Sequence, residues 1–313
     1  MDTFVRAETD RMFAGLQVNA GGVNTFEHNR VPAAVDQQTV IRMNRDTLYS
    51  FAIADISAGA TLTVPDAAGR YLSVMIVNRD HFINRVFHDP GTYQLTVEEF
   101  DTDYVLVAAR ILVDPRDPGD VARVATIQDG LRLTAASARS FRMPDYDPVT
   151  FDRTRTALLE LAHDMDDFAR SFGRRGEVDP VRHLVGAAAG WGGLPDTEAT
   201  YVGVSPDLPI GDHELRIPGE VLVDGFWSIS VYNAAGYFEP NAADAYTINS
   251  ITAAREVDGS VVVRFGGDGD PARNSIPVPE GWNYLVRLYR PRPEVLHGTW
   301  SFPTIGAGKA GQP

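Results

Sequence analysis

The sequence predicts a mainly β protein, in which two β-sandwich domains of jelly-roll-like type flank a helical region. Segments of alternating apolar and polar residues, rich in β-branched and aromatic types, occupy both ends of the chain. Asp-Pro pairs that begin helical patterns are concentrated in the middle. The 28 glycines and 20 prolines are spread along all 313 residues, as expected where many turns join short strands.

The N-terminal sandwich is expected to comprise residues 1–114. TLYSFAIADIS (47–57) alternates between two faces, while GRYLSVMIVN (69–78) and DYVLVAARILV (103–113) are richer in strand-forming residues than a helix would be. Turn residues such as Gly59 and Asp89-Pro90-Gly91 separate these segments at hairpin-like intervals.

The helical connecting region is expected to comprise residues 115–195. Each of its three helices begins with an Asp that can cap it and a Pro at the first helical position, at residues 117–118, 147–148 and 179–180. The second is predicted to run to about Ser171, and the third to stop at GWGG (190–193). The apolar stripe of the second helix predicts four side chains buried against a sheet: Leu158, Leu161, Met165 and Phe168.

The C-terminal sandwich is expected to comprise residues 196–313. Its predicted strands include ELRIP, GFWSISVYN, SVVVRF and NYLVRLYRP. In WSISVY, the side chains of Trp227, Ile229 and Val231 share one face of the strand. The opposite face carries Ser228, Ser230 and Tyr232.

Composition disfavours several classes of function. Lys and Arg total 28 against 42 Asp and Glu, so a net charge of −14 argues against binding to nucleic acid or to anionic membranes. No apolar run is long enough to span a membrane. The N-terminus lacks the apolar segment of a secretory signal, and cysteine is absent, so we expect a cytoplasmic protein.

Known catalytic and cofactor-binding motifs are missing from the sequence. There is no G-x-S-x-G, no G-x-x-x-x-G-K-[ST] and no G-x-G-x-x-G after a strand. The seven histidines form no H-x-H or H-E-x-x-H pair, and DGDPARN (268–274) lacks the remaining ligands of a calcium loop. We therefore expect neither a cofactor nor a metal.

Two polar segments adjoin apolar strands and provide the candidate catalytic residues. MNRDTLYS (43–50) contributes Asp46 and Tyr49, and VNRDHFINRVFHD (77–89) contributes Arg79 and His81. If hairpin geometry brings the segments together, these side chains, with Asn44 as a ligand-binding residue, can carry out acid–base chemistry or hold a polar ligand. The alternative is a buried hydrogen-bond network that fixes the ends of the strands.

Further candidate ligand-binding residues lie outside these segments. Gln128 falls on the apolar stripe of its helix, where a buried amide needs partners, and it can instead cap a strand end. Trp191, within GWGG, can stack on a ligand or pack inside a tight turn. Trp227 offers a similar stacking surface.

Several long motifs resemble a known pair of domains. GGVNTFEHNR, VIRMNRDTLYSFAIADI and YLSVMIVNRDHF resemble the domain of unknown function 1254. DGFWSISVYNAAGYFEPN and PEGWNYLVRLYRPRPEVLHGTWSFP resemble the domain of unknown function 1214, which usually follows it. The resemblance implies two jelly-roll-like sandwiches joined by helical segments.

The resemblance also indicates positions within each domain. The first domain's pattern of Asn, any residue, Asp-Thr-Leu-Tyr falls on residues 44–49. In the second domain, the pattern of an Asn shortly before Ile-Pro marks Asn274, although Ser275 replaces the Trp that many members carry after it. We hypothesise a cofactor-independent hydrolase or lyase acting on a polar small molecule. The alternatives are a saccharide- or small-molecule-binding protein and a homo-oligomeric scaffold.

Overall fold

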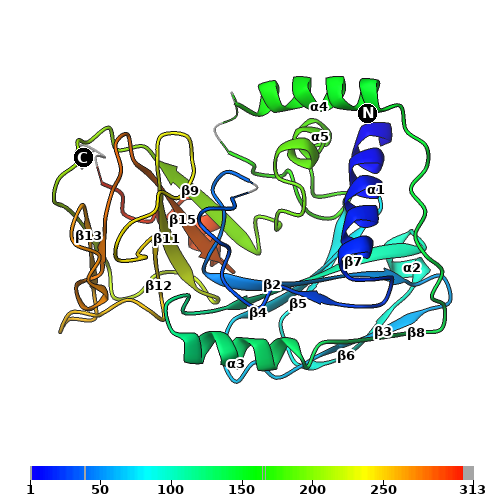
Figure 1. The fold of residues 1–313 in the computed structure, drawn as a ribbon, viewed down its shortest axis with the longest axis horizontal. Coiled ribbons are helices and arrows are strands. Elements are labelled where there is room, and N and C mark those ends of the chain that lie inside the picture. Colours follow the sequence, from blue (N-terminus) through cyan, green and yellow to red (C-terminus); the bar gives the residue numbers. More distant parts are fainter. Residues whose placement is uncertain (1, 39, 164, 166, 306–313) are drawn as a thin grey trace. The chain divides into compact units, whose positions relative to one another are not determined.

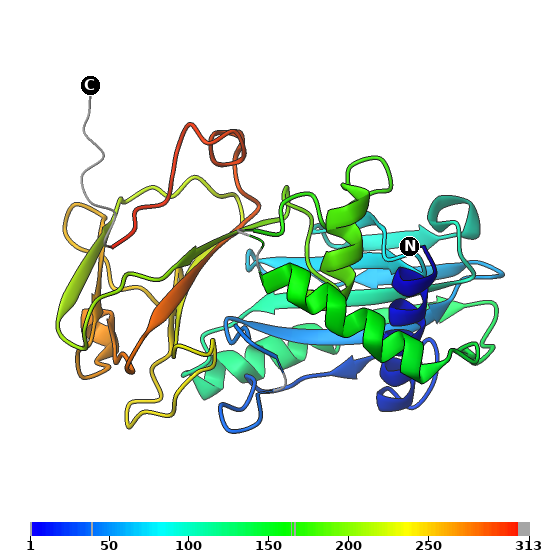
Figure 2. The same cartoon turned by 90° about the horizontal axis from the view of Figure 1, so that it is seen from above.

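Strands are the main secondary structure of residues 47–112 and 199–289, which confirms the mainly β fold class. The computed structural model describes residues 2–38, 40–163, 165 and 167–305. The chain divides into two compact units (Figures 1 and 2). The first contains residues 1–30, 48–113 and 119–196, and the second contains residues 31–47, 114–118 and 197–313.

The first unit is built on two β-sheets. The larger has the order β1-β2-β7-β4-β5, and the smaller has the order β6-β3-β8. In the larger sheet β4 pairs antiparallel with both β5 and β7, and in the smaller β3 pairs antiparallel with β6 and β8. The strands are β1 (Glu27–His28), β2 (Thr47–Asp55), β3 (Ala60–Val64), β4 (Leu72–Asn78), β5 (Ile83–Phe87), β6 (Gly91–Leu95), β7 (Tyr104–Leu112) and β8 (Arg132–Ala135).

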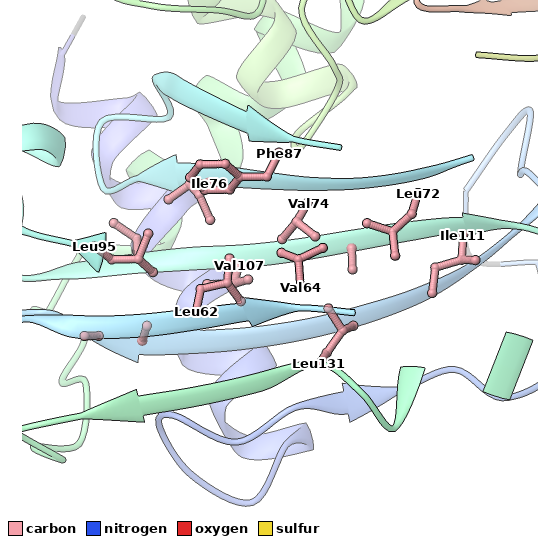
Figure 3. Close-up of a cluster of buried hydrophobic side chains, with 14 of the residues drawn as sticks. Leu62, Val64, Leu72, Val74, Ile76, Phe87, Leu95, Val107, Ile111 and Leu131 are labelled. Atoms are coloured by element: carbon pink, nitrogen blue, oxygen red, sulfur yellow. The ribbon is translucent and has the colours of Figure 1, made fainter. Parts of the chain in front are cut away.

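The hydrophobic core of the first unit lies between its two sheets. Figure 3 shows Val74, Ile76 and Val107 of the larger sheet directed toward Leu62 and Val64 of the smaller one. Alternate residues of β4 and β7 belong to this core, so period-2 alternation in the sequence decides which side chains enter it. The remaining residues of these strands face the opposite side of the larger sheet.

Three helices lie over that opposite side, and a further helix lies beside the smaller sheet (Figures 1 and 2). The three are α1 (Asp2–Asn19), α4 (Pro148–His163) and α5 (Pro180–Ala189), and the other is α3 (Pro118–Gln128). The three predicted Asp-Pro helix starts are confirmed; Asp179 accepts hydrogen bonds from two backbone N–H groups of α5. The helix α1 was not predicted from the sequence, and the short helix α2 (Val97–Phe100) completes the unit.

The prediction for the longest helix was wrong in its extent and in its buried face. α4 ends at His163 rather than near Ser171. Leu158 is buried at 6% exposure, whereas Leu161 is 58% exposed. The reason is that α4 packs on α1 and α5, in a cluster with Phe4 and Val185, and not on a sheet. A neighbouring helix covers a narrower stripe than a sheet does.

The second unit has two further sheets with a core between them. Its four-stranded sheet has the order β12-β11-β15-β9, and its three-stranded sheet has the order β10-β13-β14. The strands are β9 (Ala199–Val204), β10 (His213–Ile217), β11 (Trp227–Tyr232), β12 (Thr247–Asn249), β13 (Val261–Phe265), β14 (Ser275–Ile276) and β15 (Asn283–Tyr289). A 3-10 helix (Pro271–Arg273) and α6 (Pro293–Leu296) complete the unit.

A segment from early in the sequence, residues 31–47, belongs to the second unit. Its Gln38 amide exchanges hydrogen bonds with the backbone of Phe238. Its Met43 carbonyl accepts a hydrogen bond of 2.8 Å from the Tyr232 hydroxyl. The second unit is therefore assembled from segments nearly 200 residues apart in sequence. Within the described residues, no helix has the length and apolar character needed to cross a membrane.

Candidate functional site

The four-stranded sheet of the second unit has one apolar face and one polar face, and both are buried. Trp227, Ile229 and Val231 of β11 enter the core, as the sequence alternation predicts. The opposite face gathers hydroxyl, amide and guanidinium groups from three neighbouring strands, where core sheets normally place apolar side chains. These residues are Ser228, Ser230, Tyr232, Thr247, Asn249, Arg287 and Tyr289.

Asp46 adds a carboxyl group to this polar face. A turn precedes β2, in which the Asn44 side-chain oxygen accepts a hydrogen bond of 2.9 Å from the Asp46 N–H. Asn44 is itself held by hydrogen bonds from its amide to the hydroxyl oxygens of Thr47 (3.0 Å) and Tyr289 (3.1 Å). The Asp46 side chain is fully buried. We call Asp46, Ser228, Ser230, Thr247, Asn249 and Arg287 the Asp46 cluster.

The two oxygens of the Asp46 carboxyl differ in their hydrogen bonds. Oδ1 lies 2.7 Å from Thr247 Oγ1 and 3.0 Å from Asn249 Nδ2. Oδ2 has no hydrogen-bond partner among the described residues. Thr247 Oγ1 also lies 3.0 Å from the Ile229 carbonyl oxygen, and its one hydrogen cannot serve both acceptors. A carboxyl protonated on Oδ1 donates to Thr247 Oγ1, and the Thr247 hydroxyl then donates to the Ile229 carbonyl oxygen, so both contacts of Thr247 are hydrogen bonds.

The electrostatics agree with a protonated carboxyl. Burial raises the pKa of Asp46, and the positive charge of Arg287 together with the side chains of Asn249, Thr247 and Ser228 offsets only part of that rise. Arg287 is held by other groups: it donates to Ser230 Oγ (2.8 Å), the Tyr232 hydroxyl (2.7 Å) and the carbonyl oxygen of Arg42 (2.7 Å).

Asp55 in the first unit shows how a structural buried carboxylate differs. Its oxygens accept hydrogen bonds from the hydroxyls of Ser57 and Ser137 (2.6 Å each) and from the backbone N–H of Arg139 (2.8 Å). Burial alone would raise the pKa of Asp55, but these hydrogen bonds outweigh it and hold the pKa well below the usual range. Asp46 has neither the backbone donors nor the lowered pKa.

His81 lies in a separate polar and aromatic group of the first unit. It occupies a left-handed backbone conformation (φ 63°) and is fully buried. Its ring stacks between His183 (5.4 Å) and Trp191 (5.3 Å), and its Nε2 accepts the Gly192 N–H at 2.9 Å. Nδ1 therefore carries the hydrogen, and it has no partner among the described residues. Burial, followed by the charge of His183, lowers the pKa of His81 well below its ordinary value.

Arg79, two residues before His81, pairs with Asp10 of α1, a helix that was not predicted from the sequence. Its guanidinium makes two hydrogen bonds to the buried Asp10 carboxylate, at 2.8 and 2.7 Å. The Tyr146 hydroxyl donates to the same carboxylate at 2.8 Å, and burial, with this hydrogen bond, raises the pKa of Tyr146 to about 12.

Two other predicted site residues lie on β2 or bind its backbone. The Tyr49 ring lies under the Arg110 guanidinium at 5.5 Å. The Gln128 amide of α3 donates to the carbonyl oxygens of Asn29 (3.2 Å) and Tyr49 (3.0 Å), and to Ser50 Oγ (3.1 Å). These bonds match the strand-capping alternative for Gln128.

Trp227 and Asn274 have structural surroundings in the second unit. Trp227 is 3% exposed and packs in the hydrophobic core near Phe302. Asn274 adopts a left-handed conformation and exchanges two hydrogen bonds of 2.7 Å with the backbone of Ala254, which fixes the local turn. Neither side chain presents an exposed surface.

The structure thus brings some predicted residues together. Asp46 and Asn44 share the polar face in the second unit, while His81 and Trp191 stack in the first. The expected meeting of Asp46 with Arg79 or His81 stays a prediction. Sequence reasoning missed four residues that act on Asp46, although the alternation in WSISVY placed one of them, Ser228, on the face opposite the core. The missed residues are Ser228, Thr247, Asn249 and Arg287.

The described residues contain no group of three or more His, Asp or Glu side chains placed to hold a metal ion. The fold and the cluster define a class: a mainly β protein of two sandwich units with a half-satisfied buried carboxyl group. Residues 23–93 match the family model described as protein of unknown function DUF1254, and residues 210–293 match that of DUF1214. The two matches lie in the order that the motifs of the sequence indicated.

Solved structures share the fold. The VPA0106 protein from Vibrio parahaemolyticus is similar at a TM-score of 0.73 and 17% identity, covering 96% of this chain and 95% of that one. An uncharacterized protein from Burkholderia cenocepacia is similar at a TM-score of 0.52 and 13% identity, covering 93% and 84%. A comparison with curated proteins gives no match.

Proposed function

We propose that the protein is an enzyme, a hydrolase or lyase that acts on a polar small molecule, with Asp46 as its acid–base group. One observation carries the proposal: the buried Asp46 carboxyl uses Oδ1 for two protein hydrogen bonds and leaves Oδ2 without a described partner. An unsatisfied buried oxygen is costly, so a purely structural carboxyl would be fully paired, as Asp55 is.

The raised pKa of Asp46 supports the same role. A carboxyl group transfers protons best when its pKa lies near the working pH, and burial moves Asp46 in that direction. Oδ1 is fixed by Thr247 and Asn249, so the carboxyl has one orientation and Oδ2 is the atom left to contact a substrate. The surrounding hydroxyl and amide groups suit a polar substrate better than an apolar one.

The proposal is tested by a panel of esters, lactones, glycosides and hydroxy acids, assayed with the wild type and with Asp46→Asn. The substitution keeps the shape of the side chain but removes its ability to exchange a proton. We expect turnover of at least one substrate to fall by at least about 100-fold. Asp55→Asn is the control, because it changes a buried carboxylate that we assign to structure. Equal turnover by wild type and Asp46→Asn would refute the role of Asp46.

A further inference from the structure

Ser228 differs from Ser230, the other serine of the Asp46 cluster, in the hydrogen bonds of its hydroxyl group. Ser228 pairs across the strands with Asn249 and with Arg287, so its side chain lies in the row that contacts Asp46. The hydroxyl is close enough to lower the pKa of Asp46, yet it makes no hydrogen bond of standard geometry to the described residues. Two buried polar atoms of the cluster, Ser228 Oγ and Asp46 Oδ2, are therefore left without a hydrogen bond of standard geometry to the described residues.

Ser230, two residues along the same face, is fully used. Its Oγ accepts a hydrogen bond of 2.8 Å from Arg287 and lies 3.3 Å from Thr247 Oγ1. The contrast is informative because both serines are completely buried on one strand. Burying a hydroxyl without a partner is unfavourable, so the state of Ser228 requires a reason.

Arg287, the positively charged side chain of the cluster, does not provide a binding site for an anion. The Nη1 and Nη2 groups of Arg287 donate to Ser230, Tyr232 and the carbonyl of Arg42, all acceptors within the protein. An anion near Oδ2 would also meet the carboxyl group of Asp46. What fits between a carboxyl oxygen and a serine hydroxyl is a neutral group that donates one hydrogen bond and accepts another.

We propose that Asp46 Oδ2 and Ser228 Oγ form a subsite for a neutral O–H group, which donates to Oδ2 and accepts from Ser228. The group is either a water molecule or a hydroxyl of the ligand, and both have the same hydrogen-bonding chemistry. This subsite rests on the proposed function, since it places the reacting O–H bond of a substrate or water against the acid–base oxygen. Ser228 is then a residue that contacts the substrate.

The test is a set of crystal structures of the full chain, grown alone and with glycerol, glucose, acetate or phosphate. We expect an oxygen atom within about 3 Å of both Asp46 Oδ2 and Ser228 Oγ in the wild type. A single isolated oxygen in every crystal identifies water, and continuous polyol density identifies a ligand hydroxyl. A direct hydrogen bond between Ser228 and Asp46 with no third atom would overturn the proposal, as would acetate or phosphate in that position.

Two matched variants extend the test to solution. Ser228→Ala should lose the bridging oxygen without a fall in melting temperature, because no hydrogen bond of standard geometry to another described protein group is removed. Ser230→Ala should keep the oxygen but melt at a lower temperature, because Arg287 loses an acceptor. If Ser230→Ala does not fold, the wild type and Ser228→Ala alone decide the outcome. Retention of the oxygen in Ser228→Ala would contradict the subsite.

The failure of this subsite can be told apart from the failure of the proposed function. If Asp46→Asn loses turnover while no third atom bridges the two oxygens, the function stands and the subsite is wrong. If the bridging oxygen is present and Asp46→Asn retains full turnover, the subsite stands and the acid–base role is wrong.

Discussion

At the scale of single residues, the molecule contains two buried aspartates with opposite surroundings. Asp55 receives hydroxyl and backbone donors on both oxygens, and Asp46 receives side-chain donors on one oxygen only. The first arrangement stabilises the charged form, whereas the second favours the neutral form. Burial alone therefore does not decide the state of a carboxyl group; the number of donors does.

We expect Asp46→Asn and Asp55→Asn to change stability with opposite pH dependence. The raised pKa of Asp46 means that the folded state binds its proton more tightly, so this group's contribution falls as the pH rises above about 4. The Asn variant lacks this loss, and its stability relative to the wild type should increase toward pH 8. Urea unfolding between pH 4 and 8 measures the difference.

For Asp55→Asn, the matched variant, we expect the opposite change of stability with pH. The lowered pKa of Asp55 gives stability that is present above about pH 4 and is lost as the pH falls further. Asp55→Asn should therefore cost about 1.5–3 kcal/mol at pH 7, the usual value for hydrogen bonds to a charged group, and less at pH 3. Parallel pH profiles for the two variants would show that the surroundings of the carboxyl groups do not set their states.

At the scale of elements, helix packing decides which side of an amphipathic pattern is buried. The stripe in the sequence of α4 is real, but it is wider than the surface that α1 and α5 cover. Leu158→Ala should cost about 2–5 kcal/mol, because it removes buried side-chain volume. Leu161→Ala, on the same helix, should change the free energy of unfolding by less than about 0.5 kcal/mol. Denaturant unfolding of both variants checks this; equal losses would contradict the packing.

The turn that carries His81 should act as an acid-sensitive contact. Its ring accepts the Gly192 N–H, and a protonated ring cannot accept it. Because the folded pKa is lowered, the unfolded state binds the proton more tightly, so stability should fall as the pH drops below about 6.5. His81→Asn, which tolerates the left-handed conformation, should show a shallower decline from pH 7 to 5. His297→Asn, at an exposed position, should follow the wild type.

Elements with strong local signals were predictable from sequence, and those that depend on distant partners were not. Asp-Pro starts and strand alternation are local, so α3, α5 and the faces of β11 agree with the structure. The partners of Asp46 could not be found, because Thr247 and Asn249 lie 201 and 203 residues away. The helix α1 was missed because it buries polar residues, including Glu8 and Asp10, and so shows no clear apolar stripe.

At the scale of the whole molecule, the boundary between the two domains in sequence is not the boundary between the two units in space. Residues 31–47 precede most of the first unit, yet their contacts place them in the second. They supply the carboxyl of Asp46 and the carbonyl of Met43, both of which contact the polar face of the four-stranded sheet. The candidate site of the second unit therefore combines residues 31–47 with residues from the C-terminal part of the chain.

This dependence predicts that residues 197–313 alone are not a complete folding unit. Without the 31–47 segment, Arg287 and Tyr232 lose backbone acceptors, and a polar sheet face that is normally buried becomes exposed. We expect a chain of residues 197–313 to unfold at a lower urea concentration than the full protein. A synthetic peptide of residues 31–47 should restore stability in proportion to the logarithm of its concentration once it exceeds its dissociation constant, because it binds only the folded state. A scrambled peptide is the control. Full stability of residues 197–313 without the peptide would show that residues 31–47 are not needed for the second unit to fold.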